Sequence, residues 1–196
     1  MVLAQCLIAA ERRRSGGVQA GRGRRAWTLA LVDLMCKKKP VLAADIIRVC
    51  AVLFVALYLV PTGAHLAELP NKIGLPSEQY MLVQGIYAGW DRFGLVALGA
   101  LIFTAAHSIL VRGQQGAFFC SLTAFLCIVA TQVIFWLFTL PMNAASANWT
   151  RTPVAFAAAR RQWEYSHAAS AIFTFAALIA ILASLLLASR PSAPAP

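Results

Sequence analysis

The sequence predicts an all-α protein: a four-helix transmembrane bundle with amphipathic extensions on the outer side. Hydrophobic residues make up 60% of the 196 residues, and charged residues only 12%. A soluble domain is usually nearer to a quarter charged, so this much apolar surface needs lipid as its solvent. The apolar residues are also collected in four long runs, each able to cross a bilayer as a helix.

The first two spans are expected in the N-terminal half of the chain. The first runs from Val41 to Leu69, with Pro61 and Gly63 kinking its outer part rather than ending it. The second apolar run, Phe93–Val111, has 19 residues and is long enough to span. Upstream of this run, Ser77 is typical of the cap of an additional helix.

The third and fourth spans follow in the C-terminal half. The third is expected over Ala117–Leu140 and is bounded by Pro141. The fourth covers Ala168–Ser189 within the membrane. Its helix is predicted to begin further upstream, because Thr152 and Pro153 have the signature of a cap and a first turn.

The basic residues indicate how the chain is divided and oriented. Residues 1–40 are expected to be a basic, disordered segment with Met35 as an alternative start, residues 41–190 the membrane domain, and residues 191–196 a disordered tail. Basic residues beside apolar spans mark the cytoplasmic side. The basic N-terminus, Arg112 and Arg190 therefore predict that both termini are cytoplasmic. The predicted location is a membrane, specifically the bacterial inner (plasma) membrane.

Composition and motifs exclude several classes of function. The net charge of +10 is not accompanied by an aromatic–basic platform, so no nucleic acid partner is expected. The five cysteines form no C-x-x-C pair, which argues against a thiol–quinone oxidoreductase. No nucleophile elbow, P-loop or dinucleotide fingerprint is present. The expected partners are the lipid bilayer and a lipophilic small molecule, and the oligomeric state is not indicated.

A polar face is predicted between the first two spans. Tyr80, Gln84, Tyr87 and Asp91 recur at i, i+4, i+7 and i+11, so they share one face of a helix. We expect a hydrated interfacial face, with substrate binding as the alternative. The substrate-binding candidates are Tyr80, Gln84, Tyr87 and, from the fourth helix, Trp163.

Two His–Glu pairs are the main candidates for chemistry. His65 precedes Glu68 by three residues on the first span, and Glu164 precedes His167 by three on the fourth. Because these spans run in opposite directions, both present His and then Glu when followed outward. If the two helices are neighbours, two imidazoles and two carboxylates lie at matching depths and resemble half the ligand set of a di-iron bundle.

The identity of a bound group stays open at this stage. The four residues His65, Glu68, Glu164 and His167 would suit one Fe, Zn or Mn ion. A haem held by His65 and His167 is a further alternative. The simplest alternative is a pair of interfacial polar turns, with Arg160 and Glu164 as an ordinary ion pair. His107 lies too deep to join this group and is expected to be a packed or hydrogen-bonded residue.

Short motifs on both outer loops resemble those of a known family. They are Glu68-Leu69-Pro70-Asn71-Lys72, Leu75-Pro76, Tyr80, Val83-Gln84, Ile86-Tyr87, Gly89-Trp90 and Phe93-Gly94, then Asn148-Trp149, Ala158, Arg160-Arg161, Trp163-Glu164 and His167. Over about residues 42–190 the chain is similar to the anthrone oxygenase-like membrane proteins, known as domain of unknown function 1772. The resemblance implies a small four-helix membrane protein, and some members of that family are associated with oxidation of anthrones to anthraquinones. Trp163, Glu164 and His167 match its pattern.

Two functions follow from these observations. The first is an oxygenase or oxidoreductase acting on a lipophilic, aromatic substrate, with His167 and Glu164 as catalytic residues. In its metal version, the four His and Glu side chains bind a metal that activates oxygen. In its metal-free version, His167 held by Glu164 takes a proton from the substrate, whose anion reacts with oxygen. The alternative is a non-catalytic assembly partner or small-molecule binder whose polar cluster is structural. Transport has less support.

Overall fold

The computed structural model describes the backbone of residues 22–189 and the side chains of residues 41–189. It divides into two units, residues 1–46 and residues 47–196. In the first unit, residues 22–46 are helical, so helix extends over part of the segment that was expected to be disordered. Residues 1–21 and the tail 190–196 lie outside the described residues. All further description concerns the second unit.

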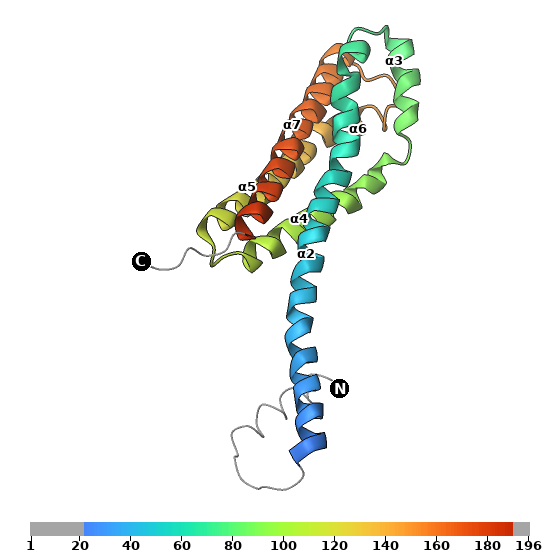
Figure 1. The fold of residues 1–196 in the computed structure, drawn as a ribbon. Helices are drawn as coiled ribbons and strands as arrows, with labels where there is room; N and C mark the ends of the chain where they lie inside the picture. Colours follow the sequence, from blue (N-terminus) through green and yellow to red (C-terminus); the bar gives the residue numbers. More distant parts are fainter. Residues whose placement is uncertain (1–21, 190–196) are drawn as a thin grey trace. The chain divides into compact units, whose positions relative to one another are not determined.

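Helices are the regular elements of the described residues, and four of them are long and apolar enough to cross a membrane: Val41–Lys72, Trp90–Leu110, Gln115–Ala145 and Phe156–Ala188. This confirms the predicted all-α four-helix bundle and an integral membrane protein. In Figure 1 the elements in chain order are α2 (Arg22–Lys72), α3 (Ser77–Gln84), the short helices η1 (Gly85–Tyr87) and η2 (Trp90–Arg92), α4 (Phe93–Leu110), α5 (Gln115–Ile134), the π-helix η3 (Phe135–Thr139), α6 (Leu140–Ala145) and α7 (Phe156–Ala188).

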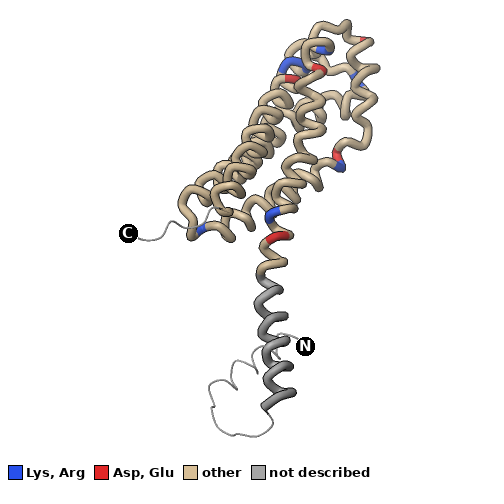
Figure 2. The backbone as a smooth tube through the Cα atoms, in the orientation of Figure 1, with Lys and Arg blue, Asp and Glu red and all other residues tan. Residues whose placement is uncertain are grey.

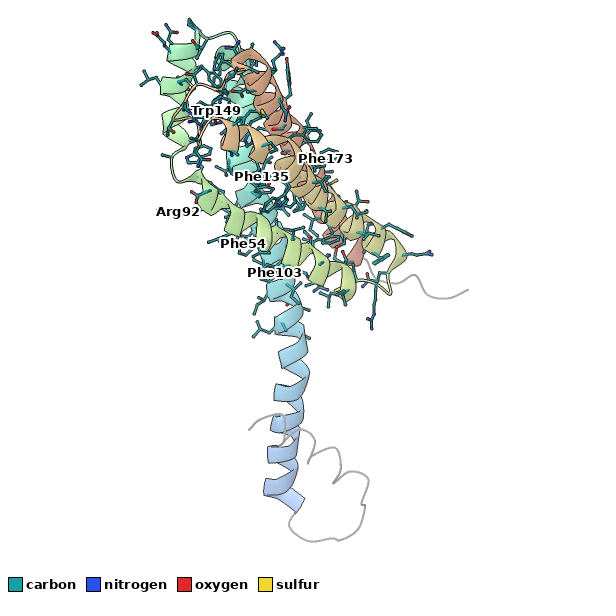
Figure 3. The ribbon with its side chains drawn as sticks, turned by 180° about the vertical axis from the view of Figure 1, so that it is seen from behind. Phe54, Arg92, Phe103, Phe135, Trp149 and Phe173 are labelled. Atoms are coloured by element: carbon teal, nitrogen blue, oxygen red, sulfur yellow. The ribbon has the colours of Figure 1, made fainter. Side chains whose placement is uncertain are left out.

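Small residues let the spans pack closely in the core. Gly99 of α4 faces the ring of Phe54 from α2, and this ring stacks on Phe103 with centroids 5.3 Å apart (Figure 3). The Ser184 hydroxyl of α7 donates to the carbonyl of Ala117 on α5, at 2.7 Å. Such small and hydroxyl-bearing residues are typical of helix contacts in lipid. The buried core residues are Ala51, Val55, Ala100, Ala124, Ile128, Ala177 and Ile181.

A second hydrogen-bonded group joins α4 to α5. The Nδ1 atom of His107 lies 3.0 Å from the hydroxyl of Ser121, which in turn lies 2.8 Å from that of Ser108. All three side chains are buried. The prediction that His107 is a hydrogen-bonded packing residue is confirmed.

Several predicted helix boundaries differ from the structure. The helix α2 continues to Lys72, beyond the predicted end at Leu69, whereas Pro61 and Gly63 lie inside it without ending it, as expected. Ser77 is the first residue of α3 rather than its cap, and its side chain makes no capping hydrogen bond. The helix α7 begins at Phe156, so Thr152 and Pro153 precede it by a turn and the predicted cap there is wrong.

The third span does not end at Pro141 but continues as α6 to Ala145. A proline has no N–H group and therefore removes the helical hydrogen bond to the carbonyl four residues before it. The chain accommodates this with the wider turn of η3 immediately upstream. The Phe138 carbonyl, which lies in this turn, accepts a hydrogen bond from Gln162 of α7 at 3.0 Å.

Charged residues lie at the two ends of this bundle, and most of them lie at one end. None occurs between Arg48 and Glu68, between Arg92 and Arg112, or between Glu164 and Arg190. Figure 2 shows charged positions gathered where α2 ends, α3 begins and α7 begins. We call this region the polar end.

Candidate functional site

Four elements bring polar side chains together at the polar end. Glu68 and Lys72 come from the last turns of α2, Tyr80 and Gln84 from α3, Tyr87 from η1, and Glu164 from α7. We call these six residues the polar cluster.

Lys72 is the centre of the polar cluster. Its ammonium nitrogen lies 3.3 Å from Oε1 of Glu164 and 3.4 Å from Oε2 of Glu68. It also lies 2.5 Å from the hydroxyl of Tyr87. The ammonium faces the rings of Tyr87 and Trp163, with distances of 4.4 and 5.0 Å to their centroids. Since the side chain of Lys72 is 3% exposed and that of Glu164 fully buried, this ion pair is shielded from solvent.

Tyr80 links α3 to the buried carboxylate. Its hydroxyl donates to Oε1 of Glu164 at 2.7 Å and accepts a hydrogen bond from the amide of Gln84 at 2.6 Å. Burial, and then the negative charge of Glu164, raise the pKa of the Tyr80 phenol far above its usual value. Tyr80 therefore stays protonated and acts as a donor. Since its proton goes to the carboxylate, the Gln84 amide must turn its N–H toward Tyr80.

Tyr87 plays the equivalent part for the second carboxylate. Its hydroxyl donates to Oε2 of Glu68. Burial, followed by this hydrogen bond, raises the pKa of the Tyr87 phenol. Each carboxylate thus receives one phenol hydrogen bond and one contact from the same ammonium group.

The two histidines lie beside the polar cluster as a stacked pair. The rings of His65 and His167 have centroids 4.1 Å apart and an interplanar angle of 33°. Aromatic rings surround them: Trp163 lies 5.0 Å from His65 and 4.3 Å from His167, and Tyr87 and Trp90 lie 4.5 and 5.5 Å from His65. His65 is buried, and its Nδ1 atom has no hydrogen-bond partner.

Helical spacing explains why these groups meet. His65, Glu68 and Lys72 lie at i, i+3 and i+7 on α2, and Glu164 and His167 lie three apart on α7, so each set shares a helix face. The condition set by the sequence, that the first and last spans are neighbours at this depth, is met, because the rings of His65 and His167 are in contact.

The predicted metal set does not fit this geometry. The side chains of His, Cys, Asp and Glu that the structure describes form no group of three or more able to hold a metal ion. The physical reason is Lys72, whose ammonium stands between the carboxylates of Glu68 and Glu164. The Fe, Zn or Mn site on His65, Glu68, Glu164 and His167 is therefore not assembled. Haem ligation is not supported either, because the two imidazoles stack on each other and leave no room for a macrocycle between them.

Glu164 has a different role from either sequence prediction. Its Oε1 atom binds Lys72 and Tyr80, whereas its Oε2 atom has no hydrogen-bond partner, so it does not hold His167. The simple ion pair with Arg160 is also not the arrangement found. Arg160 instead donates to the carbonyl of Leu75 at 2.6 Å and faces the ring of Phe156.

The predicted substrate-binding residues come together only in part. Tyr80, Gln84 and Tyr87 converge on the polar cluster, and Trp163 lies against the histidines. Asp91 is exposed and does not join them. The helix is broken at Gly89, whose φ of 84° is left-handed, so the predicted single face does not extend that far.

Sequence analysis missed two contributors to the site. Lys72 follows Glu68 by four residues, and this spacing could have identified it. Asn143 had no such signal: its side-chain oxygen accepts hydrogen bonds from the indoles of Trp163 and Trp149, at 2.7 and 3.2 Å. Trp149 belongs to three successive residues with left-handed backbone, Ala147 to Trp149, at φ values of 49°, 55° and 62°. Such strain persists only where surrounding contacts hold it.

Fold and site together define a four-helix integral membrane protein with a buried lysine–dicarboxylate cluster and a stacked histidine pair at one end of the bundle. Comparisons with protein-family models, with curated proteins and with solved structures gave no match.

Proposed function

We propose that this chain is a membrane-embedded oxidoreductase of the oxygenase type, acting on a lipophilic, aromatic substrate without a metal. The observation that carries this proposal is the stacked pair of His65 and His167 inside a wall of aromatic rings. Aromatic walls suit an aromatic ligand. The resemblance of the loop motifs to anthrone oxygenase-like proteins supports the same class of reaction.

The imidazole pair supplies the base in this proposal. Two imidazolium ions at this separation would repel each other strongly, so the pair carries at most one positive charge. An uncharged imidazole accepts a proton from an acidic C–H or O–H group of the substrate. The resulting carbanion forms a C–O bond with dioxygen, and the peroxide takes back the proton from the imidazolium. Loss of water, which breaks the O–O bond and the second C–H bond, leaves the new carbonyl, so one anthrone and one O2 give one anthraquinone and one H2O. Glu164 acts by holding Lys72 and Tyr80 in place rather than by touching His167.

The proposed setting is the bacterial inner membrane, with both termini in the cytoplasm and the polar end on the outer side. The basic N-terminal segment, Arg112 and Arg190 support this orientation. The proposed partners are the lipid bilayer and a lipophilic small molecule.

Turnover of a hydroxylated anthrone tests the proposal. The purified chain in lipid nanodiscs is incubated with the anthrone, and dioxygen uptake and anthraquinone absorbance are measured above the background of empty nanodiscs. We expect His167→Gln and His65→Gln to lose the protein-dependent rate. Tyr165→Phe, on an exposed position of the same helix, should retain it. Equal rates of turnover in all variants, or no turnover in the wild type, would refute the proposed enzymatic activity.

One observation favours a second function, a non-catalytic assembly partner or binder. Lys72 joins two carboxylates from two helices, which is also what a structural latch would do. In that case His167→Gln and His65→Gln change no turnover, and Lys72 variants lower only the stability of the bundle.

A further inference from the structure

The segment from α3 to η2 turns polar side chains toward the bundle and large apolar side chains outward, whereas the sequence predicted that its polar face meets water. Its polar residues Tyr80 and Gln84 are 0% and 4% exposed and face the polar cluster. Its large apolar residues Leu82 and Ile86 are 80% and 58% exposed. A segment surrounded by water would have the reverse arrangement.

The exposed apolar face has a direction along the chain. Glu78, Leu82 and Ile86 follow one another at intervals of four residues, which places them on one side of α3 and η1. Further along the chain, Leu95 and Leu98 are 72% and 51% exposed on α4, which is one of the four membrane-spanning helices. Along this face of the chain, a charged residue is therefore followed by two exposed apolar residues and then by the exposed apolar surface of a membrane-spanning helix.

We propose that residues 82–92 lie in the interface of the bilayer, with Leu82 and Ile86 in contact with lipid, and that Glu78, one turn earlier on α3, lies beyond it in water. The exposed apolar residues of this segment thereby continue those of α4 past the end of that span. Figure 1 shows the chain running from α3 into the adjoining end of α4. Trp90, partly buried at the junction, is the residue type that prefers this layer. The lipid covers one face of α3, and the polar cluster lies against the other.

This placement has a consequence for access to the polar cluster. A molecule that reaches Tyr80 and Gln84 by displacing α3 comes from the bilayer rather than from water. The inference does not depend on the proposed oxygenase, because it concerns only what surrounds α3.

Photo-crosslinking to lipid tests the placement. The photoreactive residue p-benzoylphenylalanine replaces Leu82 or Ile86 in the full chain, which is reconstituted in vesicles of phosphatidylethanolamine and phosphatidylglycerol. Matched controls carry it at Leu95, on the span, and at Glu78, on the same face one turn earlier. The high exposure of Leu82 makes the larger side chain tolerable. After illumination, mass spectrometry identifies the adducts.

We expect lipid adducts at positions 82 and 86 in a yield comparable to that at position 95, and well above that at position 78. Protein–protein adducts at positions 82 and 86 would overturn the inference in favour of a second copy or another protein. Absence of lipid adducts there, while position 95 gives them, would place α3 in water and overturn it as well.

Discussion

Removal of the Lys72 ammonium tests the energetic centre of the site. In Lys72→Met, Glu164 keeps its position but loses the positive charge at 3.3 Å. Because the side chain of Glu164 is fully buried, water cannot replace this charge. Breaking a buried ion pair by removing one partner typically costs about 3–5 kcal/mol. Glu68 adds less, since its side chain is 36% exposed and solvent screens its contact with Lys72.

Equilibrium unfolding in mixed detergent–SDS micelles, followed by helical circular dichroism, measures this change. Arg161→Met is the matched control, because Arg161 is an exposed cation on α7 and its loss should stay within about 0.5 kcal/mol. The double variant Lys72→Met/Glu164→Gln removes both charges. We expect it to recover stability relative to Lys72→Met, with an interaction energy near about 3 kcal/mol.

A loss of stability in Lys72→Met no larger than that in Arg161→Met would refute the buried ion pair as the energetic centre of the site. Simple addition of the effects of the single variants at positions 72 and 164 would refute it as well, because an ammonium bound to the carboxylate requires coupling between them.

Three further predictions concern the site and the packing of the spans. Because the pKa of Tyr80 is raised, this phenol stays protonated at the pH where ordinary phenols ionise, so Tyr80→Phe should leave the tyrosinate absorbance of the folded protein unchanged there. The stability due to the raised pKa is complete below the ordinary pKa of tyrosine and is lost as the pH rises above it. Wild-type stability should therefore fall more steeply with alkali than that of Tyr80→Phe. Gly99→Ala puts a methyl group against the ring of Phe54 and should lower the stability by about 1–3 kcal/mol, seen as a lower melting temperature. Gly94→Ala, with open space around it, should not, and equal melting temperatures would contradict this packing. Asn143→Ala leaves two indole N–H groups without their acceptor and should cost about 1–3 kcal/mol with a change in tryptophan fluorescence, an expectation that an unchanged spectrum and melt would refute.

The fold could be predicted because lipid imposes one rule on long segments of sequence. Runs without charge, such as residues 93–111, can satisfy their backbone in lipid only as helices. This rule fixes the number of spans but not the local details. Pro141 has the sequence signature of a helix end, yet the structure widens one turn as η3 and continues.

The candidate site could be predicted only in part, since its members were predicted one helix at a time. Spacing placed His65 and His167 at the same depth, and these residues stack. The partner of each carboxylate could not be predicted from the same spacing. Lys72, four residues after Glu68, reaches Glu164 on another helix, and this tertiary contact replaces the expected metal. The orientation of α3 could not be predicted for the same reason. Periodicity identifies an amphipathic helix, but it does not show which face of the helix packs against the bundle.

The site draws its charged members from the first and last spans, and this has a consequence for biogenesis. Membrane helices insert separately and associate afterwards. Until α7 has entered the membrane, Lys72 lacks Glu164 and His65 lacks the ring on which it stacks. The strained backbone around Trp149 also lacks the indole of Trp163, against which it packs. Until α7 is in place, a nascent chain therefore exposes a lysine without its carboxylate and a strained loop without its packing partner, a state that membrane quality control could distinguish from the folded protein.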